Sequence, residues 1–127
     1  MTRKTPVRPD RIRTVPEQFS WVDHRLVRDR YIERLTHKAC ALYLFLVTVA
    51  DSQGLSYYSD ESLCERLAMN ETSLDSALCE LRQTGLVAYK RPIYQVLPLG
   101  ETLAAKRAAG EPTVIGEIFK SLAGGAR

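Results

Sequence analysis

The feature that most constrains the fold is one continuous apolar run, ACALYLFLVTVA, from Ala39 to Ala50. Only Thr48 and the hydroxyl of Tyr43 interrupt it. The run covers 12 residues, whereas a helix needs roughly 20 to cross a bilayer. A helix that is apolar on nearly every face is a buried one. The run therefore predicts a central buried helix over residues 37–52, with other elements packed around it.

Local signals mark the ends of the predicted helices. Thr36 stands where an N-cap residue accepts a backbone hydrogen bond, and Gly54 stands where a helix stops. Upstream, Ser20 is placed to cap a helix that starts at Trp21. We expect Trp21 to anchor the core; stacking on a nucleic-acid base is the alternative.

Composition indicates one globular domain without a catalytic or metal site. The 127 residues suit a single domain, and 45% hydrophobic content allows a core. Cys40, Cys64 and Cys79 form no CxxC pair and have no His at ligand spacing, so we expect three reduced thiols. No glycine-rich phosphate loop or nucleophile elbow occurs. We expect no cofactor, no metal and no enzyme activity, and a cytoplasmic location because no signal peptide is recognisable.

The net charge of +3 is unevenly distributed along the chain. Residues 1–35 carry nine Lys or Arg against five Asp or Glu, whereas residues 36–100 carry five against seven. Within the first part, residues 1–18 mix basic residues with three prolines, which disfavours regular structure. We interpret residues 1–18 as a flexible basic arm that contacts DNA phosphates or a minor groove; a solvated tail is the alternative. Its candidate contacts are Arg8, Arg11 and Arg13.

The chain after the buried helix predicts a short strand, two helices and a β-hairpin. The signals are leucines at helical spacing, capping residues and β-branched runs. A turn at 51–54 and a strand at 55–58 are followed by a helix at 60–68, capped by Ser59, and a helix at 71–84, capped by Asn70 and ended by Gly85. Strands at 86–89 and 93–97, joined by a turn at 90–92, complete the order.

This order resembles the winged helix-turn-helix of MarR- and GntR-type regulators. The resemblance covers residues 36–98 and is carried by Ser59, Leu63, Leu67, Met69, Asn70, Leu74, Ala77, Leu78, Leu81, Gly85, Leu86 and Val87. It implies a mainly α fold with a small β-hairpin wing (α+β), a winged helix-turn-helix with flanking N- and C-terminal helices. The predicted division is an arm at 1–18, a winged-helix domain with a helical extension at 19–98, and a helical tail at 99–127.

The resemblance also implies where double-stranded DNA would bind. The helix at 71–84 would enter the major groove, and the wing tip would meet a neighbouring phosphate. The candidate DNA contacts are Thr72, Ser73, Ser76 and Gln83 on the helix, and Lys90 and Arg91 on the wing.

The chain departs from those regulators in the charge of this helix. Glu71 opens the helix, Asp75 and Glu80 are expected on its outward side, and Arg82 is its one basic residue. Acidic groups repel phosphates, so the arm and the wing must supply the positive charge.

An apolar stripe near the C-terminus is expected to be buried against another surface. It consists of Val114, Ile115, Ile118, Phe119 and Leu122. It folds back on its own domain or pairs with a partner; by resemblance to regulators that dimerise through terminal helices, we expect a homodimer.

The leading functional hypothesis is a small DNA-binding factor that regulates transcription or serves a mobile element or replicon, with no membrane partner. The alternative is a winged-helix protein-interaction module in a larger assembly, which the acidic helix and the apolar stripe favour. A third hypothesis is single-stranded or RNA binding through the arm and the tyrosines Tyr57, Tyr58 and Tyr94.

Overall fold

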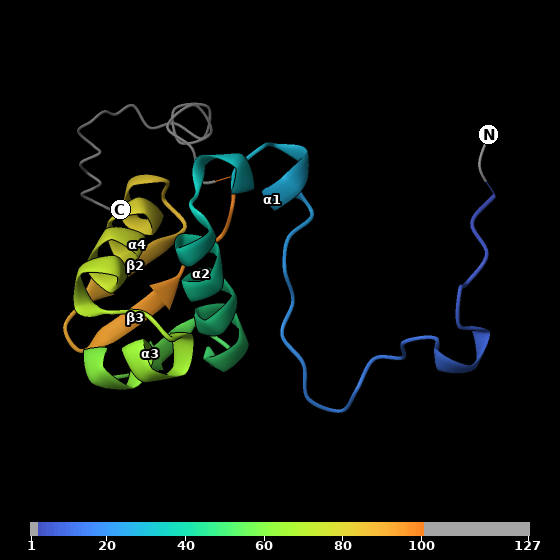
Figure 1. Ribbon diagram of the computed structural model, residues 1–127, viewed down its shortest axis with the longest axis horizontal. Helices are drawn as coiled ribbons and strands as arrows, with labels where there is room; N and C mark the ends of the chain where they lie inside the picture. Colours follow the sequence, from blue (N-terminus) through green and yellow to red (C-terminus); the bar gives the residue numbers. More distant parts are fainter. Residues whose placement is uncertain (1–2, 101–127) are drawn as a thin grey trace.

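The computed structural model describes residues 3–100. Short helices precede a central helix, and a three-stranded sheet and two more helices follow. The elements are η1 (Pro9–Arg11), α1 (Arg25–Arg28), η2 (Ile32–Arg34), α2 (His37–Val49), β1 (Leu55–Tyr57), α3 (Asp60–Leu67), α4 (Glu71–Gln83), β2 (Val87–Lys90) and β3 (Ile93–Val96). The predicted α+β class with helices dominant is confirmed, and the order of the elements is consistent with a winged-helix layout (Figure 1). The predicted C-terminal helix lies outside the described residues.

Helix α2 is the centre of the core, as the apolar run predicts. The side chain of Thr36 accepts a hydrogen bond from the backbone N–H of Ala39, which confirms the predicted N-cap. The buried face of α2 consists of Ala39, Leu42, Tyr43, Leu46 and Val47. The expectation of burial on nearly every face is wrong, because Leu44 is 62% exposed. Between residues 3 and 100, no helix has the length and apolarity needed to cross a membrane.

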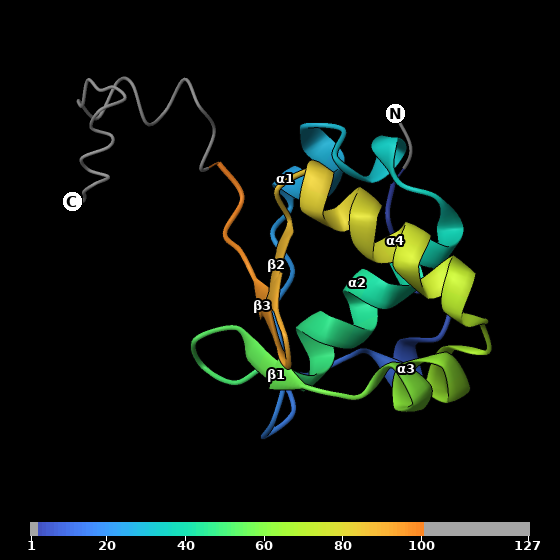
Figure 2. The same ribbon diagram turned by 90° about the vertical axis from the view of Figure 1, so that its left-hand side faces the viewer.

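Helices α3 and α4 form a helix-turn-helix with both predicted caps in place. The Ser59 hydroxyl accepts from the backbone N–H of Ser62 at 3.1 Å, and Asn70 Oδ1 accepts from that of Ser73 at 2.8 Å. Ala68, between the two helices, has a left-handed backbone with φ of 53°. This conformation turns the chain sharply, so α4 packs across α2 (Figure 2).

The sheet is antiparallel with strand order β1-β3-β2, so β2 lies at the edge nearer α4. Tyr94 on β3 pairs with Ser56 on β1 and with Tyr89 on β2. Its side chain is 1% exposed, so the interpretation of Tyr94 as a base-stacking surface residue is wrong. Tyr58 packs edge-on against Phe45 and is partly buried.

The segment before α2 differs from its prediction. No helix begins at Trp21; the first α-helix is α1, and the Asp23 carboxylate accepts from the backbone N–H of Arg25 at its start. Ser20 instead donates to the carbonyl of Thr48 at 3.3 Å, which lays the segment along the C-terminal end of α2. The prediction of Trp21 as a core anchor is wrong, because its side chain is 72% exposed.

Candidate nucleic-acid interface

Helix α4 buries one face and leaves a polar face open. Leu74, Ala77 and Leu81 point into the core, because they recur at helical spacing. The opposite face is exposed and carries Thr72, Ser76, Cys79 and Gln83. Three of the four predicted contacts on this helix, Thr72, Ser76 and Gln83, are therefore together on one accessible surface.

The fourth predicted contact, Ser73, lies at the edge of that face against α2. Its hydroxyl accepts a hydrogen bond from Lys38 Nζ at 2.9 Å. Lys38 is exposed near the start of α2, beside the N-terminal turn of α4. Sequence reasoning missed Lys38, because its position beside α4 depends on how the two helices cross. The signal available in the sequence was that Lys38 is the second residue of the predicted central helix.

Glu80 lies on the same edge as Ser73, two turns further along α4. Its carboxylate accepts from the backbone N–H of Thr36 at 2.8 Å and from the Thr36 hydroxyl at 2.9 Å. The expectation that Glu80 lies on the outward face is wrong. A carboxylate is favoured there, because the N-terminus of α2 presents unpaired N–H groups and a partial positive charge. Glu71 and Asp75 remain as acidic residues on the exposed surface of α4.

The other edge of the open face forms a groove with the hairpin. Its lining is Asp75, Leu78, Cys79, Arg82, Gln83 and Tyr89. Tyr89 belongs to β2, whose last residue is Lys90, and Arg91 follows in the turn to β3. Both basic residues are exposed. Figure 2 shows α4 and the hairpin side by side, and the groove lies between α4 and Tyr89 of the hairpin.

The structure does not bring the basic arm together with α4. The arm leaves the body on the side of α2 that is away from α4 (Figures 1 and 2). Arg8 is paired with Asp10, with Nη2 and Oδ2 at 2.8 Å, and this contact raises the pKa of Arg8 and lowers that of Asp10. Arg11 and Arg13 are exposed. The arm is thus a separate basic element joined to the domain at Ser20.

The remaining predicted site residues form the apolar stripe near the C-terminus. Val114, Ile115, Ile118, Phe119 and Leu122 lie outside the described residues. Across residues 3–100, no group of three His, Cys, Asp or Glu side chains is placed to hold a metal ion.

Comparisons with known proteins add one solved structure. No protein-family model and no curated protein matches the chain. A solved structure described as "Structure of Rep-DNA complex" is similar to it, with a TM-score of 0.49 and 20% sequence identity. The match covers 76% of this chain and 92% of that chain.

Proposed function

We propose that this protein binds double-stranded DNA, with the open face of α4 in the major groove and the hairpin turn on an adjacent phosphate. The observation that carries the proposal is that α4 exposes Thr72, Ser76 and Gln83, and that the groove along α4 reaches Tyr89 of β2, next to the exposed Lys90 and Arg91. Hydroxyl and amide side chains reach base edges and phosphates, and a helix fits the major groove. We also propose that the protein acts by binding and not as an enzyme.

The position of Glu80 supports the proposal electrostatically. Its carboxylate is bound to Thr36 at the start of α2 and does not stand on the face offered to DNA. The open face then carries Glu71 and Asp75 against Arg82, so its net charge is slightly negative and it contributes hydrogen bonds rather than attraction to phosphates. Positive charge comes from its borders, where Lys38 of α2 contacts Ser73 and where Lys90 ends β2.

The basic arm supplies the rest of the attraction to phosphates. Residues 1–18 in extended form reach at most roughly 60 Å, which is long enough to pass around the domain to a neighbouring stretch of duplex. Each phosphate neutralised releases counterions and steepens the dependence of affinity on salt. A homodimer would place two such surfaces on a two-fold DNA site, either in transcriptional control or at a replicon.

The test is binding to random-sequence duplex DNA, measured by fluorescence anisotropy between about 50 and 300 mM salt. The variant neutralises Arg8, Arg11 and Arg13 to Gln. The control neutralises three other exposed arginines, Arg28, Arg30 and Arg34, so both variants lose the same charge. We expect the arm variant to lose up to about three units of salt slope and the control to lose less. Absence of binding by the wild type at the lowest salt would exclude the proposal.

A second candidate function is recognition of a protein. The observation that favours it is a set of large exposed apolar side chains: Phe19, Trp21, Val22 and Val27 before α2, and Leu44 on α2. If DNA binding fails, this surface becomes the place to look for a partner. Phe19→Asp then disrupts assembly, whereas arm substitutions have no effect.

A further inference from the structure

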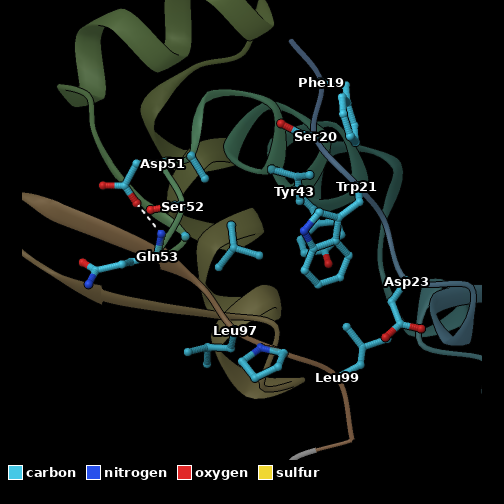
Figure 3. A pocket seen from close by; sticks show the side chains of 15 residues that line it. Phe19, Ser20, Trp21, Asp23, Tyr43, Asp51, Ser52, Gln53, Leu97 and Leu99 are labelled. Carbon is cyan, nitrogen blue, oxygen red and sulfur yellow. Dashed lines mark hydrogen bonds between the residues drawn. The ribbon is translucent and has the colours of Figure 1, made fainter. Parts of the chain in front are cut away.

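An apolar pocket lies on the side of the domain where the N-terminal segment and the end of β3 meet (Figure 3). Its volume is about 420 Å³. Three parts of the chain form its walls: the Phe19–Trp21 segment, Tyr43 and Val47 of α2, and residues 97–99 after β3. The turn at 51–54 closes one end. The pocket is distinct from the α4 surface and plays no part in the proposed DNA contact.

The aromatic side chains at this pocket are largely uncovered. Trp21 is 72% exposed and Phe19 is 65% exposed, although both line an apolar cavity. In Figure 3, Trp21 lies close to Tyr43, and Phe19 stands further along the same segment. Large aromatic rings at the mouth of an apolar cavity are typical of a surface that another apolar element covers.

The chain leaves the described region at the rim of this pocket. Leu99 is buried in the pocket wall, and its carbonyl accepts a hydrogen bond from Arg25 Nη2 at 3.1 Å. Arg25 is itself held by Asp23, with Nη2 and Oδ2 at 2.7 Å. Gly100 follows with φ of 86° and packs against the Arg25 guanidinium. The described part of the chain therefore ends at Gly100, beside the pocket.

We propose that the pocket holds the apolar stripe near the C-terminus of the same chain. The stripe consists of Val114, Ile115, Ile118, Phe119 and Leu122. Residues 101–113 connect it to the pocket rim and span up to roughly 45 Å when extended, so the stripe reaches the cavity easily. A tether of this length gives a local concentration on the order of millimolar. The stripe of its own chain therefore occupies the pocket ahead of a second copy at micromolar concentrations.

The test uses Trp21 as the reporter, because it is the one tryptophan of the chain. The full-length double variant Ile118→Asp with Phe119→Asp places charges in the stripe. The control, Glu117→Gln with Lys120→Gln, changes two neighbouring residues that lie off the stripe. We expect a red shift of Trp21 emission and faster quenching by acrylamide in the stripe variant, with no change in the control. Far-ultraviolet circular dichroism verifies that both variants are folded.

A variant on the pocket side and a dilution series complete the test. Phe19→Asp removes an exposed wall residue and is expected to shift Trp21 emission as the stripe variant does. The emission of the wild type should stay constant over about a hundredfold dilution, since a tethered contact does not depend on protein concentration. Emission that changes on dilution would identify a second copy as the occupant and overturn the proposal. Identical emission in wild type and stripe variant would overturn it as well.

Discussion

The Glu80 carboxylate accepts two hydrogen bonds from Thr36, from the backbone N–H at 2.8 Å and from the hydroxyl at 2.9 Å. The Thr36 hydroxyl in turn accepts from the backbone N–H of Ala39 at 3.3 Å. The contact joins residues 44 positions apart, so it fixes the C-terminal half of α4 against the start of α2. The angle at which α4 presents its open face depends on this junction.

Removal of the Glu80 charge should therefore cost stability rather than change DNA affinity. Glu80→Gln leaves one acceptor oxygen for two donors, and we expect the free energy of unfolding to fall by about 1 kcal/mol. Asp75→Asn is the matched change, because it removes one negative charge from the exposed side of the same helix. We expect Asp75→Asn to leave stability unchanged and to raise affinity for random DNA about twofold to threefold at low salt.

Chemical denaturation and anisotropy on both variants measure these effects. A larger gain in DNA affinity for Glu80→Gln than for Asp75→Asn would contradict the assignment of the open face.

Substitutions on the helix and on the wing should separate sequence preference from general affinity. We expect Thr72→Ala, Ser76→Ala and Gln83→Ala each to change discrimination between DNA sequences by about 1–3 kcal/mol. Lys90→Gln and Arg91→Gln should weaken binding to all sequences alike and lower the salt slope by about one each. Competition binding against a randomised duplex library distinguishes the two patterns. Uniform losses from all five substitutions would assign the open face of α4 to phosphate contact alone.

The pair of Asp23 and Arg25 should make stability depend on pH in the acid range. Hydrogen bonds from the Arg25 guanidinium and backbone N–H lower the pKa of Asp23 from 3.8 to about 2. Because the pKa is lower in the folded state, the pair stabilises the fold above pH 4, and that contribution is lost as the pH falls towards about 2. Asp23→Asn should remove this part of the pH dependence, as measured by denaturation between about pH 5 and pH 2.

The matched control for this experiment is Asp75→Asn, which removes an exposed carboxylate of α4. It should retain the steep loss of stability below pH 4. If wild type and Asp23→Asn lose stability in parallel, the pair does not contribute to the acid sensitivity of the fold.

The features that were predicted correctly from the sequence are local ones. Thr36, Ser59 and Asn70 each accept from a backbone N–H three residues further along the chain. Such a bond depends on residue type and spacing alone, so the sequence contains all the information. The buried face of α4 follows from periodicity in the same way.

The features that the sequence did not predict depend on contacts between distant residues. Trp21 is large and apolar, which suggests burial, but the cavity that it lines is formed by Tyr43 of α2 and Leu99 beyond the sheet. Glu80 was placed outward by helical periodicity, whereas the start of α2 provides its partners. Lys38 joined the candidate site through Ser73, 35 residues away. Each of these features thus depends on contacts between segments that are far apart in the sequence.

The two glycines that flank the sheet provide a paired test of its packing. Gly54 and Gly85 both have positive φ, at 83° and 77°, which costs an L-residue about 1–2 kcal/mol. A Cβ at Gly85 meets no atom within 4 Å, whereas one at Gly54 would lie 2.6 Å from the carbonyl oxygen of Val96. Gly54 also accepts a hydrogen bond from the Val96 N–H at 2.8 Å, which joins β1 to β3. We therefore expect Gly85→Ala to lower the free energy of unfolding by about 1 kcal/mol and Gly54→Ala by roughly 2–4 kcal/mol, measured by urea denaturation. Equal losses would show that Val96 moves aside freely and that β1 is not held tightly to the sheet.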